Sequence, residues 1–212
     1  MCGRYYIAAE DKELAEMGEI AKKSSLADKM LHSTGKAVLT AGEIRPTDVA
    51  PVIALNRKGI RSIFPMRWGF SLPGKSTSII NARVETVGEK PTFKEAWARH
   101  RCILPASWYF EWEHLVRNDG KKTTGDKFMI QPKGSTHTYL CGLYRFEDPF
   151  PVPVFTILTR EPGSDTLKKL HDRMPLIMPR ERIDDWINPE NDPAALLPDA
   201  RTDMIMKKSD MS

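Results

Sequence analysis

The feature of the sequence that most constrains the fold is a series of short apolar segments, each bounded by Gly, Pro, Asn or Asp. Apolar segments of this length between turn-forming residues are typical of β-strands. We therefore predict strands over the following ranges: 2–8, 49–55, 128–132, 138–146, 152–159 and 175–179.

Helical patterns are fewer, and the clearest covers residues 11–23. There Leu14, Met17 and Ile20 recur at helical spacing, and Asp11 is placed to cap the N-terminus. Because helices and strands do not alternate regularly, the pattern favours an α+β fold over a parallel doubly wound sheet. Further helices are predicted over 92–100, 163–171 and 179–187.

We expect one β-rich domain over residues 1–198, built of largely antiparallel sheets in an open, barrel-like arrangement with a few short flanking helices. At 212 residues the chain is long enough to bury a sizeable core. The polar residues 24–36 are expected to be mobile. Residues 116–126 are rich in turn formers and are predicted to form a loop or hairpin insertion. Residues 199–212 are expected to be a poorly ordered tail.

Several classes of protein are disfavoured by the composition. The N-terminal region has no apolar run of signal-peptide length, and no apolar run is long enough to span a membrane. We therefore expect a cytoplasmic protein with no membrane partner. Cys2, Cys102 and Cys141 are odd in number and lack CxxC spacing, which argues against a disulfide framework and a zinc site. They are predicted to be reduced thiols.

The positive charge is unevenly distributed. The whole chain carries +4, whereas residues 43–101 hold eleven Lys or Arg against five Asp or Glu, a net charge of +6. Such a stretch can attract phosphates, although a solvated surface has the same composition.

Cys2 directly follows the initiator methionine. Removal of Met1 would leave a cysteine with a free α-amine, whose pKa of roughly 7.7–8.0 keeps part of it neutral near pH 7. Such an amine condenses with an aldehyde, and the adjacent thiol can then close a five-membered thiazolidine. The alternative is that Cys2 simply packs as a small apolar residue.

The segment "INARVET" contains three alternating polar residues, Asn81, Arg83 and Glu85. On an extended segment their side chains would share one face. Such a face could form part of a site, but it is also typical of an exposed edge strand.

Glu111 lies within the aromatic segment "SWYFEW". Desolvation there would raise the pKa of its carboxyl toward values useful for proton transfer. A buried carboxylate paired with an arginine is the structural alternative. The neighbouring aromatic rings fit a core as well as a platform for stacking bases.

In "LHDRMP", His171 is the candidate for a group that titrates near neutrality, and Arg173 is a candidate ligand for phosphate or carboxylate. A lone histidine is more often an ordinary core or surface residue. We predict no metal site because the remaining histidines lack ligand-like spacing: His32, His100, His114 and His137.

Taken together, "MCGR", "NARVET", "RCILPASWYFEW" and "HDRMP" resemble, in this order, the SRAP family, the SOS response-associated peptidases that act as sensors of abasic sites in DNA. The resemblance runs from Met1 to about Pro179. It implies a DNA-damage protein without a cofactor, monomeric, and nucleoid-associated when it binds single-stranded DNA that contains abasic sites. It also implies autopeptidase activity and a crosslinking or lyase-type activity on such sites.

The resemblance assigns catalytic roles to four residues. After removal of Met1, Cys2 would form a thiazolidine with the ring-opened aldehyde of an abasic site. Glu111 would handle protons beside the α-amine, and His171 would act as acid and base in opening of the sugar or in reversal of the crosslink. Asn81 would orient Cys2 or the opened deoxyribose.

The resemblance also assigns contacts with DNA. Trp68 and Pro46 resemble positions that wedge against or stack on neighbouring bases, and Thr159 lies where a backbone phosphate is contacted. Three arginines would hold phosphates that flank the lesion: Arg4, Arg83 and Arg173.

The sequence departs from the family pattern at Trp108, where the family usually has glycine, so the local backbone must be one that a side chain tolerates. Two other functions share some of these features. Class II glutamine amidotransferases also begin Met-Cys-Gly, but the chain lacks their further motifs. A module that only binds single-stranded DNA would use the basic stretch and Trp68 without any role for Cys2.

Overall fold

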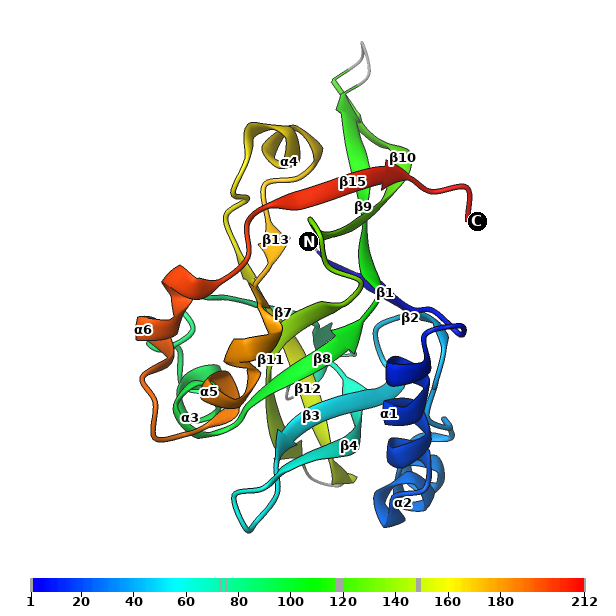
Figure 1. The fold of residues 1–212 in the computed structure, drawn as a ribbon, viewed down its shortest axis with the longest axis vertical. Helices are drawn as coiled ribbons and strands as arrows, with labels where there is room; N and C mark the ends of the chain where they lie inside the picture. Colours follow the sequence, from blue (N-terminus) through cyan, green and yellow to red (C-terminus); the bar gives the residue numbers. More distant parts are fainter. Residues whose placement is uncertain (1, 73, 75, 117–119, 148–149, 212) are drawn as a thin grey trace.

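The computed structural model describes residues 2–72, 74, 76–116, 120–147 and 150–211. Within them the strands form two large sheets and one two-stranded sheet, with short helices at the periphery (Figure 1). This architecture confirms the predicted β-rich α+β domain with largely antiparallel, barrel-like sheets.

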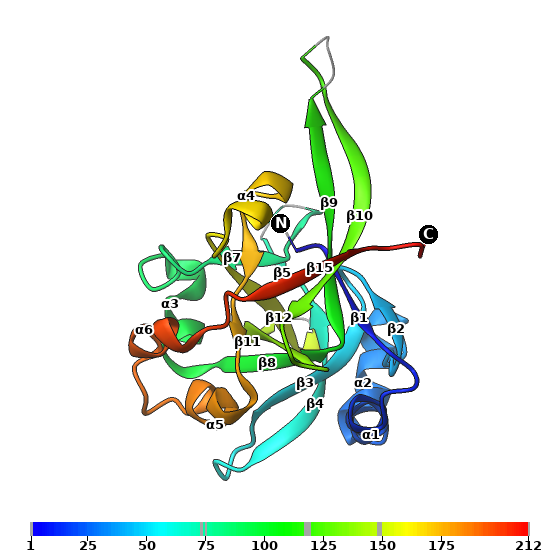
Figure 2. The ribbon, with the colours of Figure 1, turned by 45° about the horizontal axis from the view of Figure 1, so that its top comes forward.

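The first sheet, called here the five-stranded sheet, has the order β15-β10-β9-β1-β2, and its strands pair antiparallel. Its central strand β9 and its neighbour β10 form a long hairpin that projects beyond the rest of the molecule (Figure 2). The bounds are β1 (Arg4–Ile7), β2 (Gly42–Ile44), β9 (Trp108–Val116), β10 (Lys122–Pro132) and β15 (Met204–Lys208).

The second sheet, called here the barrel sheet, has the order β13-β12-β4-β3-β8-β11-β14, and β7 also pairs with β12. An additional pairing between β11 and β12 joins β12, β4, β3, β8 and β11 into a ring, which gives the partly closed barrel. Only β4 and β7, among the described strands, pair in parallel, both with β12. The bounds are β3 (Val49–Leu55), β4 (Arg61–Trp68), β7 (Asn81–Arg83), β8 (Arg101–Ala106), β11 (Thr138–Glu147), β12 (Phe150–Arg160), β13 (Met174–Pro175) and β14 (Ile177–Met178). The small sheet pairs β5 (Phe70–Ser71) with β6 (Ser78–Ile79).

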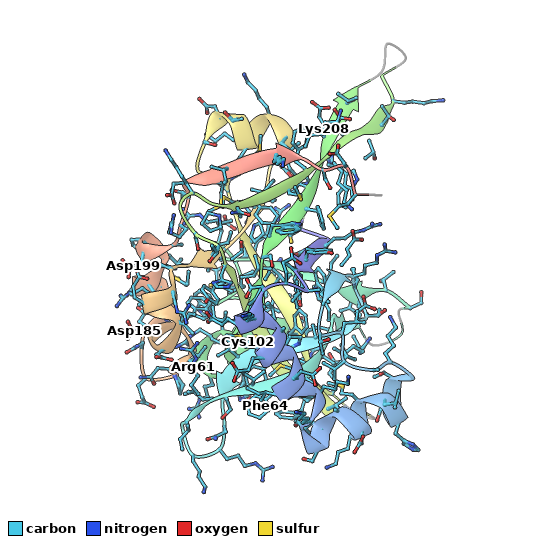
Figure 3. All side chains as sticks on the ribbon, turned by 45° about the vertical axis from the view of Figure 1, so that its right-hand side comes forward. Arg61, Phe64, Cys102, Asp185, Asp199 and Lys208 are labelled. Atoms are coloured by element: carbon cyan, nitrogen blue, oxygen red, sulfur yellow. The ribbon has the colours of Figure 1, made fainter. Side chains whose placement is uncertain are left out.

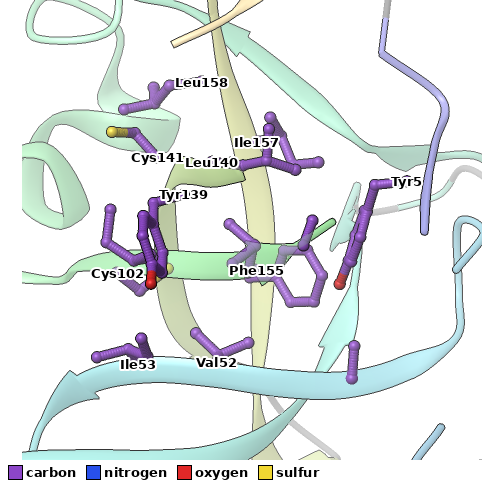
Figure 4. Close-up of a cluster of buried hydrophobic side chains, with 14 of the residues drawn as sticks. Tyr5, Val52, Ile53, Cys102, Tyr139, Leu140, Cys141, Phe155, Ile157 and Leu158 are labelled. Carbon is purple, nitrogen blue, oxygen red and sulfur yellow. The ribbon is translucent and has the colours of Figure 1, made fainter. Parts of the chain in front are cut away.

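The core fills the barrel with apolar side chains from strands far apart in the sequence (Figure 4). Gly142 shows how tightly it is packed, because a Cβ there would lie 2.7 Å from Leu104 Cδ2 and 2.9 Å from the Thr156 carbonyl oxygen. Cys102 and Cys141 are free, buried thiols in this core, as is Cys2 at its edge.

The predicted helices are present, with small shifts at their ends. The helix predicted over residues 11–23 is α1 (Lys12–Lys22), and Asp11 caps it by accepting a hydrogen bond from the Leu14 amide. The other helices are α2 (Ser25–Thr34), α3 (Pro91–Arg99), α4 (Asp165–Leu170), α5 (Ile183–Ile187) and α6 (Pro193–Leu196), with 3₁₀ turns at Arg180–Arg182 and Leu197–Asp199.

The expectation that residues 24–36 are mobile is wrong, because most of them form α2. Ser24 caps the helix, and Gly35 ends it in a left-handed conformation with φ of 69°. Ala27 and Met30 are buried against the core, so a polar-looking segment has enough apolar contact to dock.

The end of the chain also differs from the expected poorly ordered tail. Residues 204–208 form β15, which pairs with β10, and Lys208 makes an ion pair with Asp126 on that strand (Figure 3). The insertion predicted at 116–126 is the β9–β10 hairpin, of which residues 117–119 lie outside the described residues.

Candidate functional site

A cavity of about 980 Å³ opens where the five-stranded sheet meets β7 and the segment that follows α4. Most of the described residues that line it are polar or charged, and more of them are basic than acidic. The lining residues are Gly3, Arg4, Ile80, Arg83, Glu111, Trp112, His114, Thr124, Lys127, His171, Asp172, Arg173 and Met211.

Cys2 lies just before β1, next to the lining residue Gly3, and is fully buried. Its thiol donates a long hydrogen bond of 3.8 Å to the Arg4 carbonyl oxygen. Burial and the nearby charge of Glu111 raise the pKa of the thiol, so sulfur is protonated at neutral pH and its attack on a substrate requires a base. The expected removal of Met1 concerns a residue outside the described part of the chain.

Glu111 is placed beside the N-terminal segment because β1 pairs with β9, with Arg4 opposite Phe110. Its side chain is 4% exposed. Burial raises the pKa of the carboxyl to about 7, as the aromatic surroundings predicted. At neutral pH the acid and the carboxylate therefore coexist, and Glu111 can both give and take a proton.

Asn81 ties the segment before β1 to the barrel sheet, next to the lining residue Ile80. It lies on β7, beside Ile157 of β12, and its side-chain nitrogen donates a 2.9 Å hydrogen bond to the carbonyl oxygen of Cys2. The other end of the amide, Oδ1, is buried and has no hydrogen-bond partner within the described residues. The amide thus fixes the N-terminal segment on one side and leaves an acceptor on the other.

His171 follows α4, and its side chain is 10% exposed. Burial lowers the pKa of the ring to about 4, with a contribution from His114, whose ring meets it edge-to-face at 4.7 Å. Two groups compete for Nδ1: the Arg173 amide donates to it at 3.0 Å, and Asp172 Oδ1 lies 2.7 Å away. The neutral ring accepts from Arg173, and a protonated ring would instead donate to Asp172.

The three predicted phosphate ligands all line the cavity but differ in availability. Arg83 is exposed. Arg4 forms a 2.8 Å ion pair with Glu43 and lies over the Trp112 ring.

Arg173 is the least available of the three arginines, since it is 8% exposed. Its guanidinium donates to both carboxylate oxygens of Glu85, at 2.9 and 2.8 Å, and to the Thr159 carbonyl oxygen at 2.7 Å. In this structure Arg173 therefore acts mainly as a clamp between β12 and the segment after β7.

Trp68 and Thr159 do not present their side chains as predicted. Trp68 is fully buried, stacks with Phe155 at 5.8 Å between ring centroids, and donates to the Ile80 carbonyl oxygen. Thr159 is also fully buried, with its hydroxyl directed at the Ala82 carbonyl oxygen. Both belong to the core of the barrel, so neither is accessible to a base or a phosphate in this conformation.

Pro46 lies outside the lining of the cavity, in the turn between β2 and β3. Trp108 is accommodated by its neighbour across the strand pair, because its ring stacks on Tyr6 at 4.7 Å with an interplanar angle of 7°. Stacking on Tyr6 thus accommodates the Trp108 side chain at the position where the family usually has glycine.

Eight described lining residues were not singled out by the sequence analysis as site residues: Gly3, Ile80, Trp112, His114, Thr124, Lys127, Asp172 and Met211. Lys127 comes from β10, whose first half was predicted to be an insertion. Its partners are distant in the sequence, so no local pattern marks it.

Comparison with known proteins gives a direct result: the family model described as SOS response associated peptidase (SRAP) matches residues 1–209. The chain belongs to the SRAP family. The SRAP chain is 32% identical over 204 residues to the abasic site processing protein YoqW of Bacillus subtilis, covering 90% of this chain and 82% of that one. It is 36% identical over 163 residues to the abasic site processing protein YoaM of the same organism, covering 71% and 69%.

Solved structures agree with the SRAP fold. A phage-related protein from Bordetella bronchiseptica superimposes with a TM-score of 0.72 at 19% identity, covering 99% of this chain and 95% of that one. A protein from Bacteroides thetaiotaomicron gives a TM-score of 0.70 at 20% identity, with 98% and 91% coverage.

Two further properties of the SRAP chain concern only the part that the structure describes. No cluster of three or more His, Cys, Asp or Glu there is arranged to hold a metal ion. None of the helices in that part has the length and apolar character needed to cross a membrane.

Proposed function

We propose that this protein senses abasic sites in single-stranded DNA and shields them through a covalent thiazolidine link to Cys2. Two observations support it. Curated relatives that share most of the chain are named abasic site processing proteins. The cavity, whose lining includes Gly3 directly after the buried Cys2, combines Glu111 and His171 with basic side chains.

The chemistry is a condensation that needs no oxidant or reductant. Once Met1 is removed, the α-amine of Cys2 adds to the C1′ aldehyde of the opened sugar and loses one water to form an imine. The thiol then adds across the C=N bond: sulfur bonds to carbon, and the thiol proton passes to nitrogen. The product is a five-membered ring that a lone thiol or a lone lysine cannot form.

The neighbours of Cys2 fit the proton transfers of this sequence. Glu111 has a pKa of about 7, so it can take the proton from the amine or thiol and give one to the departing water. His171 is neutral at physiological pH and can accept the hydroxyl proton as the sugar ring opens. Asn81 holds the Cys2 carbonyl and offers Oδ1 to a sugar hydroxyl.

The observation that carries the proposal is the hydrogen bond from Asn81 to the Cys2 carbonyl, beside a carboxyl with a strongly raised pKa. The hydrogen bond fixes the main chain of Cys2, and the carboxyl supplies a proton donor and acceptor close to its thiol. The autopeptidase and lyase-type activities that the resemblance implies would use the same thiol, amine and carboxyl.

The test is mass spectrometry of the purified protein mixed with a single-stranded oligonucleotide that bears one abasic site. We expect an adduct with the mass of the processed protein plus the oligonucleotide minus one water. An undamaged oligonucleotide and Cys2→Ala should give none. Cys141→Ala, which removes a buried thiol elsewhere, should still react.

A different outcome would favour the binding-module alternative. If processed, folded protein gave only salt-sensitive, noncovalent binding that Cys2→Ala left unchanged, the covalent mechanism would be wrong.

A further inference from the structure

A single carboxylate, Glu43 on β2, gathers three basic side chains at the edge of the cavity. Its Oε1 accepts hydrogen bonds from Arg4 and Arg45, and its Oε2 accepts one from Lys127, each at 2.8 Å. We call these four residues the Glu43 cluster. Burial alone would raise the pKa of the Glu43 carboxyl, but the bonds from Lys127 and Arg45 outweigh it, and the pKa is lowered.

The Glu43 cluster carries an excess of positive charge, since one carboxylate faces three cations. The opposite side of the cavity differs, because Arg173 is neutralised by Glu85 and only Arg83 adds a charge among the described arginines there. Cations crowded within a partly desolvated site repel one another unless an anion joins them. The stronger attraction for an anion therefore lies on the side of the Glu43 cluster.

Two members of the cluster are directed at the cavity by an aromatic support. Lys127 lies opposite Trp112 in the strand register, and its ammonium is 4.0 Å from the Phe110 ring centroid and 5.4 Å from that of Trp112. The Arg4 guanidinium lies 5.0 Å from the Trp112 centroid. Rings beneath both cations restrict their rotamers, so little freedom is left to lose when a ligand binds.

We propose that Lys127, held in place by Glu43, completes a subsite for one phosphodiester of single-stranded DNA beside the lesion, together with Arg4, which the family resemblance already implies as a phosphate ligand. Arg45 extends the same positive surface toward the turn that contains Pro46. The inference rests on the proposed function only in taking DNA as the ligand. It does not depend on the covalent chemistry of Cys2.

The test therefore uses Cys2→Ala protein and a labelled single-stranded oligonucleotide that carries a tetrahydrofuran analogue of the abasic sugar, which cannot open to an aldehyde. In this background Lys127→Met should weaken binding about tenfold, the effect of losing one charge-assisted hydrogen bond. It should also reduce the slope of log K against log salt by about 0.7. Lys127→Arg should restore most of the affinity. Lys58→Met, at an exposed turn away from the cavity, is the matched control.

Neutral methylphosphonates placed one at a time along the oligonucleotide locate the phosphate. We expect a methylphosphonate at one position near the lesion to weaken binding of the Cys2→Ala protein. The same methylphosphonate should not weaken binding of the protein that carries both Cys2→Ala and Lys127→Met, because that protein already lacks the contact. Glu43→Gln should flatten this positional profile, because Arg4 and Lys127 are then free to move. A general loss of stability would not have that effect.

Either of two results would overturn the proposal. One is that Lys127→Met, shown to be folded by circular dichroism, binds no differently from Lys58→Met. The other is that each methylphosphonate lowers the affinity equally with and without Lys127. The Glu43 cluster would then attract polyanions without binding one particular phosphate. Neither result bears on crosslinking, which is measured separately with Cys2 intact.

Discussion

The side-chain nitrogen of Asn81 lies 2.9 Å from the carbonyl oxygen of Cys2, and this bond ties the segment before β1 to the barrel sheet. Residues 2 and 3 are not part of β1, so ladder hydrogen bonds do not hold them. In the proposed reaction, the orientation of Cys2 would therefore depend on a side chain from β7. A misplacement of about 1 Å is enough to slow a reaction a hundredfold.

Asn81→Ala should slow crosslink formation about tenfold to a hundredfold while lowering the free energy of unfolding by only about 1 kcal/mol. Initial rates from denaturing gels and urea unfolding measure the two effects. Asn191→Ala is the matched control, because it loses a similar bond of 3.0 Å to the Asp185 carbonyl oxygen. Equal rates for the two variants would contradict a positioning role for Asn81.

Glu111→Gln should make the protein more stable at alkaline pH. The folded state raises the pKa of this carboxyl from 4.5 to about 7, so it binds the proton more tightly than the unfolded state does. The contribution to stability is complete below pH 4.5 and is lost as pH rises through about 7. A glutamine cannot ionise, so at pH 8 the free energy of unfolding of Glu111→Gln should exceed that of the wild-type protein by roughly 1–3 kcal/mol.

Urea unfolding at pH 5 and pH 8 checks this expectation, with Glu113→Gln on the same strand as control. A wild-type protein whose stability did not fall between these two pH values would argue against a buried carboxyl with a raised pKa. Loss of crosslinking in Glu111→Gln, with stability gained, would show that this residue is kept for chemistry.

His171 should remain neutral throughout the physiological range. Because its pKa is lowered to about 4, its contribution to stability is present above its ordinary pKa of 6.5 and is lost as pH falls through about 4. The ring signals of His171 in NMR spectra should not shift between pH 8 and about pH 5.5.

His114→Ala should raise the pKa of His171, since His114 adds to the lowering. The same NMR titration measures it, and His32→Ala on α2 serves as control. If the titration of His171 were unchanged in His114→Ala, His114 would have no electrostatic effect on the pKa of His171.

Thr47→Gly should stabilise the protein. The turn from Arg45 to Asp48 closes with a 3.0 Å backbone hydrogen bond and holds Thr47 at φ of 75°, a conformation that suits glycine. Relief of this strain should add roughly 1 kcal/mol. Loss of the exposed contact with Lys36 offsets little of it.

Thermal unfolding should show a rise in Tm of about 2–4 °C for a chain of this size. Thr123→Gly, at an exposed position of β10, should instead lower stability because glycine weakens a strand. A lower Tm for Thr47→Gly would mean that the threonine side chain outweighs the strain.

The sequence alone predicts elements whose signals are local. Asp11 and the apolar spacing behind it mark α1 correctly, and the apolar run at 49–55 coincides with β3. Helix α2 was missed because it buries few side chains, although Ser24 and Gly35 are ordinary cap residues in hindsight.

The site was predictable to the extent that its residues stand in recognisable motifs. The motifs single out Cys2, Glu111 and His171. The structure places Glu111 and His171 in the lining of one cavity and Cys2 close enough to Glu111 for its charge to raise the pKa of the thiol. The sequence does not distinguish a buried aromatic residue from an exposed one, because both occur in short apolar strands. Trp68, which was predicted to contact bases, is fully buried. Nor does the sequence reveal Lys127, whose role depends on Glu43 across the sheet.

The position of β1 between β2 and β9 has a consequence for synthesis of the protein. Cys2 is buried only when β9 is in place, so the ribosome must extend the chain at least to Phe110 before the thiol is covered. Until then the thiol of Cys2 is exposed on the nascent chain, and afterwards the folded sheet covers it. The order of strands thus sets the point in synthesis at which the thiol of Cys2 becomes buried.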